Sequence, residues 1–331
     1  VIDGKSERGG YPVIRKNMKQ LCIDQAAFAE RLLEGLNEID WPESTKEMQR
    51  NWIGRSTGVE VQFDIVGGGK FSIFTTCIET IYGITFMVLA PDGDLVQELM
   101  PRIQNQEEVK AYIQETISKS EMDRTELNKG KTGCRLEGIK AINPVNGREV
   151  EVFIGDFVLA NYGTGAVMAV PSHDQRDFEY AIAHNIDRIQ VIEGQDVSEH
   201  AFEKQDYLGK GCKLINSEEF TGLTVEEAKV AITKKLVDMG IAKETVNYRF
   251  REWIFARQRY WGEPVPIVHL EDGTDYVLPD EELPLILPEL EDYKGHNGKA
   301  PLENATEWKQ YNKNGVKGVR ETSTMPGSAG S

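Results

Sequence analysis

The sequence predicts a mixed α+β fold with a barrel-like domain between residues 56 and 243. Two observations indicate this class. Stretches with the period of two that is typical of strands are interspersed with stretches of helical period. The two kinds of stretch do not alternate strictly as βαβ units would, which disfavours a purely parallel sheet. We expect three parts along the chain: residues 1–55, 56–243 and 244–331.

The first part contains two predicted helices. Residues 22–40 carry Phe28, Leu32, Leu33, Leu36 and Ile39 at helical spacing, so this face is expected to be buried. The opposite face carries charged side chains that are expected to meet water, namely Glu30, Arg31, Glu34 and Glu38. A second, shorter helix is predicted over residues 44–53.

From Val59 onward the period changes to two. Val59, Val61 and Phe63 alternate with polar residues, a glycine turn follows at residues 67–69, and residues 71–76 form the partner strand of a predicted hairpin. Helices are then predicted over residues 107–120 and 178–183. Further strands are predicted at residues 84–89, 139–142, 149–159 and 189–192.

Thr224 and Glu227 have the spacing of a capping box, which predicts a helix that starts there and ends at Gly240. Its buried stripe is expected to consist of Val225, Ala228, Ile232 and Leu236.

Composition excludes several classes of protein. No apolar run approaches 18 residues, so no membrane contact is expected. The four cysteines are scattered without a CxxC pair, which predicts no metal site and favours a reducing, cytoplasmic location. A net charge of −16 argues against nucleic-acid binding by the whole surface. The chain starts at Val1 and has no charged tail, so we expect it to be a piece of a longer protein.

Residues 162–177 (YGTGAVMAVPSHDQRD) form the most informative segment. An apolar stretch ends at Pro171, and a helix start is predicted with Asp174 as its N-cap and Asp177 in its first turn. The helix dipole and the unpaired N–H groups there favour ionised carboxylates. Such carboxylates are ordinary caps in many proteins, and they are equally suited to bind an ammonium group.

A second segment, residues 75–80, carries Thr75, Thr76 and Thr80. Threonines are common in strands, which is one explanation of their presence here. The other is that their branched, stiff side chains line a small cavity that selects by size. Both interpretations stay open on this pattern alone.

Arginine and aromatic residues alternate near residues 248–261 of this otherwise acidic chain. This pattern is typical of sites that bind RNA or a nucleotide, although stacking between packed domains would use the same residues. The members are Arg249, Arg251, Arg257 and Arg259 with Tyr248, Trp253, Tyr260 and Trp261.

Taken in order, five segments closely resemble leucyl-tRNA synthetase of the bacterial type, in its middle third. They are WPE (41–43), MQRNWIGRS (48–56), the threonine segment, residues 162–177 and RQRYWG (257–262). The resemblance implies a barrel-like editing domain inserted in a Rossmann-type class I synthetase core, of which only part is present. The family's His-Ile-Gly-His and Lys-Met-Ser-Lys-Ser signatures are absent from the sequence, so no aminoacylation is expected from this chain.

The resemblance also implies a reaction and its partners. The editing domain hydrolyses the ester of mischarged leucine tRNA, here norvalyl-, isoleucyl- or methionyl-tRNA, at the tRNA 3′ end. No cofactor is expected for editing, whereas ATP and Mg serve the full-length enzyme, and the protein is expected to be a monomer. Such a second sieve is needed because a hydrophobic pocket separates amino acids that differ by one methylene by only about 1–3 kcal/mol.

Site residues follow from the resemblance by position. Thr80 matches the threonine that blocks leucine, Thr75 and Thr76 line the pocket near the ester, and Asp177 binds the α-ammonium group. Pocket residues around the adenosine and the side chain are Tyr162, Met168 and Val170, with Asp174 as a supporting acid. His173 is expected to pack or orient its neighbours, because no catalytic triad is present. Hydrolysis is expected to use a positioned water, helped by the substrate's ribose hydroxyl.

The chain departs from the family pattern at several places, two of which bear on function. Cys77, Ile78 and Glu79 stand where the family has Arg-Pro-Asp, which removes a phosphate contact to the tRNA end. Cys77 is not expected to be a nucleophile, because no partner base is evident. Residues 6–9 (SERG) replace a Cys-x-x-Cys zinc knuckle, so that zinc is expected to be lost.

Two other functions compete with editing. A non-catalytic tRNA-docking fragment with decayed editing would explain the changes at residues 77–79. An editing domain of the isoleucine or valine enzymes is disfavoured by the HDQRD run and by the lack of a Trp beside the threonines.

Overall fold

The computed structural model describes residues 5, 6, 9–11, 13, 18–119, 124, 132–160, 163–250, 252–295 and 298–331. The chain forms two compact units. The larger unit comprises Val1–Lys16 and Gly54–Arg249, and the smaller unit comprises Asn17–Ile53 and Phe250–Ser331. Because the smaller unit is assembled from segments on both sides of Gly54–Arg249, this part of the larger unit is an insertion within it.

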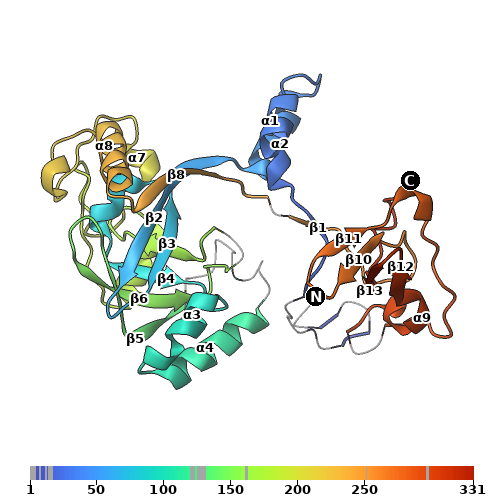
Figure 1. Ribbon diagram of the computed structural model, residues 1–331. Coiled ribbons are helices and arrows are strands. Elements are labelled where there is room, and N and C mark those ends of the chain that lie inside the picture. The colour runs from blue at the N-terminus through green and yellow to red at the C-terminus, as the bar shows by residue number, and fades with distance from the viewer. Residues whose placement is uncertain are drawn as a thin grey trace. The chain divides into compact units, whose positions relative to one another are not determined.

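A mixed sheet forms the centre of the larger unit (Figure 1). Its strand order is β3-β2-β5-β6-β4-β7, and β8 adds to β2. β4 and β6 are parallel, whereas the other neighbouring strands are antiparallel. The strands are β2 (Ser56–Ile65), β3 (Lys70–Thr75), β4 (Phe86–Leu89), β5 (Gly133–Ile142), β6 (Glu149–Gly155), β7 (Ala166–Ala169) and β8 (Ala242–Asn247).

The sheet curves but does not close. Its two end strands, β3 and β7, contact each other, yet no hydrogen-bonded ladder joins them within the described ranges. The predicted α+β class is therefore confirmed, and the predicted barrel is an open one.

Helices pack against this sheet. They are α3 (Asp94–Leu99), α4 (Gln106–Ser118), α6 (Gln175–Ala183), α7 (Lys204–Tyr207) and α8 (Val225–Asp238), with the 3₁₀ helices η2 (Ile78–Gly83), η3 (Met100–Arg102) and η4 (Glu218–Phe220). The capping box of Thr224 and Glu227 is present at the start of α8, as predicted. Its predicted stripe is fully buried and joins the core cluster of the sheet.

The hydrophobic core of the larger unit follows from the alternation in β2. Val59, Val61, Phe63 and Ile65 are buried, as the period of two predicts, and the Phe63 ring stacks on that of Phe71 in β3 at 5.8 Å between centroids. The hairpin of β2 and β3 is thus anchored in the core along its length, which fixes the position of Thr75 at the end of β3.

The smaller unit has a four-stranded sheet of order β11-β10-β13-β12 and a two-stranded pair, β1 with β9. Val268, Leu278 and Tyr311 form its small core cluster. Its strands are β1 (Cys22–Ile23), β9 (Trp253–Ile254), β10 (Ile267–Leu270), β11 (Asp275–Val277), β12 (Gln310–Lys313) and β13 (Val316–Arg320). Its helices are α1 (Ala29–Gly35), α2 (Glu43–Ile53) and α9 (Thr306–Lys309), with the 3₁₀ helices η1 (Ala26–Phe28), η5 (Asp280–Glu282) and η6 (Pro301–Asn304).

Two predicted elements were wrong. The helix expected over residues 22–40 is divided into β1, η1 and the short helix α1, and Phe28 and Leu32 of its expected buried face are 47% and 49% exposed. The strand expected at residues 189–192 is reduced to a single bridge between Ile192 and Leu214. No helix in the described ranges is long and apolar enough to cross a membrane.

Candidate active site

The threonine segment lies where β3 leaves the sheet and η2 begins. Thr75 pairs with Val59 of β2 and is 9% exposed, and Thr80 within η2 is 1% exposed. Gly58 of β2 allows the close approach of the strands, because a Cβ atom there would lie 2.4 Å from the carbonyl oxygen of Thr75. Ile78 and Ile81 are buried in the core and fix the direction of η2.

The backbone of Cys77 holds the hydroxyl groups of two threonines. Its N–H donates to Oγ1 of Thr75 at 3.0 Å, and its carbonyl oxygen accepts from Oγ1 of Thr80 at 2.8 Å. The N–H of Thr80 donates to the same carbonyl at 3.1 Å. Because these contacts use main-chain atoms, they do not depend on which side chain residue 77 carries.

The predicted helix start is present in α6. Asp174 is its N-cap and accepts from the N–H groups of Arg176 (2.9 Å) and Asp177 (3.1 Å), so its expected capping role is confirmed. Asp177 is 7% exposed, and its Oδ2 accepts from the N–H of Val170 at 3.0 Å. This bond ties the first turn of α6 to the chain that leaves β7. A carboxylate has about four acceptor positions, and this N–H takes one of them.

The remaining predicted pocket residues lie along β7 and just beyond it. Met168 is half-buried opposite Met87 of β4, and Val170 is buried in the core cluster. Tyr162 lies outside the described residues. The contact between β3 and β7 brings the threonine segment and the β7–α6 segment to the same end of the sheet. β3 ends at Thr75 and β7 carries Met168, so these two strands lead into the two segments of the candidate site.

His173 is a structural residue in this arrangement. It is 5% exposed, its Nε2 accepts from the N–H of Val191 at 3.0 Å, and its Nδ1 lies 3.0 Å from the carbonyl oxygen of Phe202. A neutral ring with its proton on Nδ1 satisfies both contacts. Burial lowers the pKa of His173 to about 4, so the ring stays neutral and oriented at physiological pH.

Two residues that sequence reasoning did not single out, Tyr207 and Lys229, bond to the threonine segment. Glu79 of this segment is fully buried, and its Oε1 accepts from the hydroxyl of Tyr207 at 3.2 Å, while Oε2 has no hydrogen-bond partner among the described residues. Burial raises the pKa of Glu79 above its ordinary value. Nζ of Lys229 donates to the carbonyl oxygen of Thr76 at 3.0 Å. Because Tyr207 and Lys229 are more than a hundred residues away in sequence, no local pattern could have revealed these contacts.

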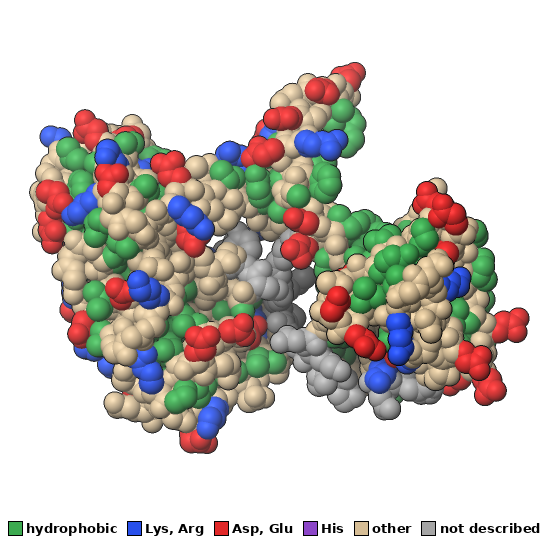
Figure 2. Space-filling model, viewed as in Figure 1, with side chains coloured by type: hydrophobic (Ala, Val, Ile, Leu, Met, Phe, Trp, Pro, Cys, Tyr) green, Lys and Arg blue, Asp and Glu red, His purple; other side chains and the backbone are tan. Residues whose placement is uncertain are grey.

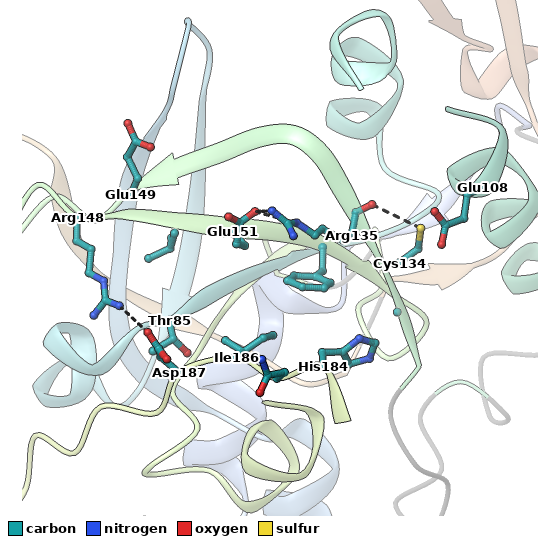
Figure 3. Close-up of a pocket in the computed structure, with 14 residues that line it drawn as sticks. Thr85, Glu108, Cys134, Arg135, Arg148, Glu149, Glu151, His184, Ile186 and Asp187 are labelled. Atoms are coloured by element: carbon teal, nitrogen blue, oxygen red, sulfur yellow. Dashed lines mark hydrogen bonds and ion pairs between the residues drawn. The ribbon is translucent and has the colours of Figure 1, made fainter. Parts of the chain in front are cut away.

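Figure 3 shows an open pocket of about 470 Å³ elsewhere on the larger unit. Four of its charged side chains form two ion pairs, Arg135 with Glu151 at 2.8 Å and Arg148 with Asp187 at 3.6 Å, and the side chains of Glu108 and Glu149 also line it. None of the predicted site residues lines this pocket, so we base the candidate site on the threonine and β7–α6 segments.

The described residues contain no group of three or more His, Cys, Asp or Glu side chains that could hold a metal ion. All four cysteines are free. Of the SERG segment expected to replace a zinc knuckle, residues 7 and 8 lie outside the described residues.

The arginine and aromatic residues near 248–261 are partly engaged in local structure. Arg257 donates to the backbone carbonyl oxygens of Ile254, Phe255 and Ala256. Trp261 is 78% exposed and stacks parallel to Tyr293 with 6.3 Å between centroids. Arg257 therefore stabilises the turn that follows β9. The exposed ring of Trp261 is compatible with either of the two roles that the sequence suggests.

Comparison with known proteins agrees with this site. The family model described as leucyl-tRNA synthetase, editing domain, matches residues 50–237, a stretch that contains both segments. The chain belongs to this family. The predicted resemblance to leucyl-tRNA synthetase is thereby confirmed, and the family indicates a role related to tRNA editing through a module of the aminoacyl-tRNA hydrolase type.

A solved structure is similar along nearly the whole chain. It is the crystal structure of the ternary complex of Agrobacterium radiobacter K84 agnB2 LeuRS with tRNA and LeuAMS, with a TM-score of 0.77 and 29% sequence identity. The match covers 99% of this chain and 37% of that chain. The flanking smaller unit therefore also has a counterpart in a synthetase, beyond the range of the editing-domain match.

Proposed function

We propose that this chain hydrolyses the ester of mischarged leucine tRNA, with norvalyl-, isoleucyl- or methionyl-tRNA as substrates, as part of a leucyl-tRNA synthetase. The observation that carries the proposal is the contact between β3 and β7, the strands that lead into the threonine segment and the start of α6, inside the region that matches the editing domain. One segment supplies stiff, size-selective walls, and the other supplies a buried carboxylate.

Each residue has a proposed role. Thr80 limits the length of the amino-acid side chain, Thr75 and Thr76 lie beside the ester, and Asp177 binds the α-ammonium group. Met168, Val170 and Tyr162 surround the amino-acid side chain and the terminal adenosine, and Asp174 keeps the first turn of α6 in place. The hydrogen bond from the N–H of Val170 to Asp177 supports the role of Asp177, because it fixes the carboxylate before the substrate arrives.

The chemistry of the proposed step needs only a positioned water. Ester hydrolysis proceeds when water attacks the carbonyl carbon and the tRNA ribose oxygen leaves, and oriented donors stabilise the charge that develops on the carbonyl oxygen. We propose that editing uses no cofactor and that ATP and Mg belong to the full-length enzyme. The proposed partner is the 3′ end of leucine tRNA, bound by a cytoplasmic monomer. The similar structure is a complex of a LeuRS with tRNA, which supports the choice of partner.

A tRNA-docking fragment with decayed editing is the second candidate, favoured by Cys77, Ile78 and Glu79 in place of Arg-Pro-Asp. Deacylation assays separate the two. The folded chain is incubated with leucine tRNA that carries isoleucine or norvaline, and with leucine tRNA that carries leucine as the matched control. Editing predicts that the first two lose their amino acid faster than without protein while leucyl-tRNA persists. Rates equal to the protein-free control for all three would favour the docking fragment.

A further inference from the structure

The peptide group between Thr76 and Cys77 is held at both ends. Its carbonyl oxygen accepts from Nζ of Lys229 at 3.0 Å, and its N–H donates to Oγ1 of Thr75 at 3.0 Å. A peptide group is planar and rotates as a unit, so its two ends cannot turn independently. Fixing the carbonyl with Lys229 therefore also fixes the N–H that orients the hydroxyl of Thr75.

Lys229 is carried by a rigid support. It belongs to α8, whose buried stripe is part of the core and whose first turn is closed by the capping box. Its side chain is half-buried and crosses from α8 to the end of β3, a contact between residues 153 positions apart. The other polar groups beneath the segment are the buried carboxyl of Glu79 and the hydroxyl of Tyr207.

We propose that Lys229 is a positioning residue for hydrolysis, which holds the Thr76–Cys77 peptide and through it the hydroxyl of Thr75 in the orientation that the reaction needs. The inference rests on the proposed function. Without the ammonium group the carbonyl of Thr76 loses its donor, the peptide can rotate, and the N–H of Cys77 leaves Thr75. Substrate still binds, because the pocket walls and Asp177 are unchanged, but the reacting groups are held less well.

The test compares three variants of the whole chain in deacylation of isoleucyl-tRNA. Lys229→Met removes the donor but keeps the length of the side chain, and Lys229→Arg restores a charged donor. Lys234→Met is the matched control, because Lys234 lies on the same helix and pairs with Asp238 at the surface. We expect Lys229→Met to lower kcat by about 10- to 100-fold, the loss that follows from one charged hydrogen bond. KM should be unchanged, Lys229→Arg should recover most of kcat, and Lys234→Met should match the parent.

A rise in KM for Lys229→Met that becomes smaller at high salt, with kcat unchanged, would show that Lys229 contacts the substrate and would overturn the proposal. Equal kcat in Lys229→Met and the parent would overturn it too. If the unaltered chain hydrolyses nothing, the proposed function fails, and amide hydrogen exchange then tests the positioning role alone. Exchange at the N–H of Cys77 should be faster in Lys229→Met than in Lys234→Met, and equal protection in the two would contradict it.

Discussion

The side chain of residue 77 has no part in the hydrogen bonds from Cys77 to Thr75 and Thr80. Both contacts use its N–H and carbonyl groups. Exchanging the family's arginine for cysteine therefore removes a cation from the surface of the site while leaving the hydroxyls in place. On this ground we expect the loss of arginine to weaken binding of the tRNA end more than it impairs the hydrolytic step.

Substitutions of Thr80 test whether the pocket selects the amino acid by size. Thr80→Ala removes both branches of a side chain that is 1% exposed, so leucyl-tRNA should become a substrate. Thr80→Val keeps both branches and loses only the hydrogen bond to the carbonyl of Cys77, so it should still reject leucine. The ratio of deacylation rates for leucyl- and isoleucyl-tRNA measures this. If both variants accept leucine, the hydroxyl rather than the bulk excludes it.

The buried carboxyl group of Glu79 leads us to expect that the stability of the fold depends on pH. Its pKa is raised by burial, so the folded state keeps a proton that the unfolded state releases above its ordinary pKa of 4.5. The folded protein therefore loses stability as pH rises from that value through the raised pKa. Glu79→Gln keeps an acceptor for Tyr207 without a buried charge, and should be increasingly more stable than the parent from pH 5 to pH 8. Thermal unfolding across this range measures it, and a constant difference would contradict it.

Local chemistry in the sequence was sufficient for some residues of the site and not for others. Asp174 was predicted as an N-cap because capping depends on residues within one helical turn. The contact of the buried Glu79 with Tyr207 depends on how α7 packs, and the bond from Lys229 to Thr76 depends on how α8 packs. Neither contact has a signature in the local sequence. The roles of Thr80 and Asp177 came from the family resemblance, and they stay predictions.

Among the elements, α8 is the most completely predicted. Its capping box and its buried stripe were both read from sequence because each is a local pattern with helical spacing. Thr224→Ala removes the side-chain acceptor for the N–H of Glu227 and should lower the stability of the larger unit by about 1 kcal/mol. Chemical denaturation measures this loss. Val230→Ala, at a position of α8 that is 71% exposed, is a comparison outside the cap, and an equal loss in both would argue against the capping role.

The sheet of the smaller unit contains a second pH-dependent feature. His269 in β10 lies 2.6 Å from Asp275 in β11 and 2.9 Å from Glu321 just after β13. Partial burial alone would lower its pKa, but hydrogen bonds to Glu321 and Asp275 raise it above 6.5. The resulting stabilisation is complete below about pH 6.5, the unfolded value, and is lost as pH rises through the higher folded pKa.

His269→Gln should therefore destabilise the smaller unit at pH 6 and have less effect at pH 9, as measured by thermal unfolding. His200→Gln, at an exposed position of the larger unit, provides the matched control. Equal effects at the two pH values would show that the charge on His269 does not matter.

Elements without a local signature were predicted poorly. The apolar face of residues 22–40 suggested a buried helix, yet Phe28 and Leu32 are exposed and only α1 is helical. Residues 189–192 have strand composition, but the bridge of Ile192 with Leu214 is the only strand-type pair that they form among the described residues, so they make no ladder. A strand needs a neighbour, and composition does not say whether one is present.

For the whole molecule, periodicity gave the α+β class but not the strand order. The parallel contact of β4 with β6 and the insertion of β8 beside β2 join distant segments, and no local pattern specifies such pairings. The open curvature of the sheet likewise depends on how its end strands meet. The structure forms two units. The three parts predicted with boundaries at residues 55 and 243 stay predictions.

Charge also acts on the scale of the whole molecule. The net charge is −16, and acidic and basic side chains intermingle on the face shown in Figure 2. To the proposed tRNA partner this face offers local contacts rather than a broad electrostatic field. This makes the carboxylate of Asp177 central to the account, because it offers a specific charge partner for the amino acid at that end.

Deacylation of isoleucyl-tRNA by Asp177→Asn tests directly whether Asp177 binds the α-ammonium group of the amino acid. Asparagine keeps an acceptor for the N–H of Val170 but removes the charge proposed to bind the ammonium group. Glu179→Gln removes one exposed carboxylate from the same helix and serves as the control. We expect Asp177→Asn to lose about 10- to 100-fold in kcat/KM without unfolding and Glu179→Gln to equal the parent. Parent-like hydrolysis by Asp177→Asn would contradict it.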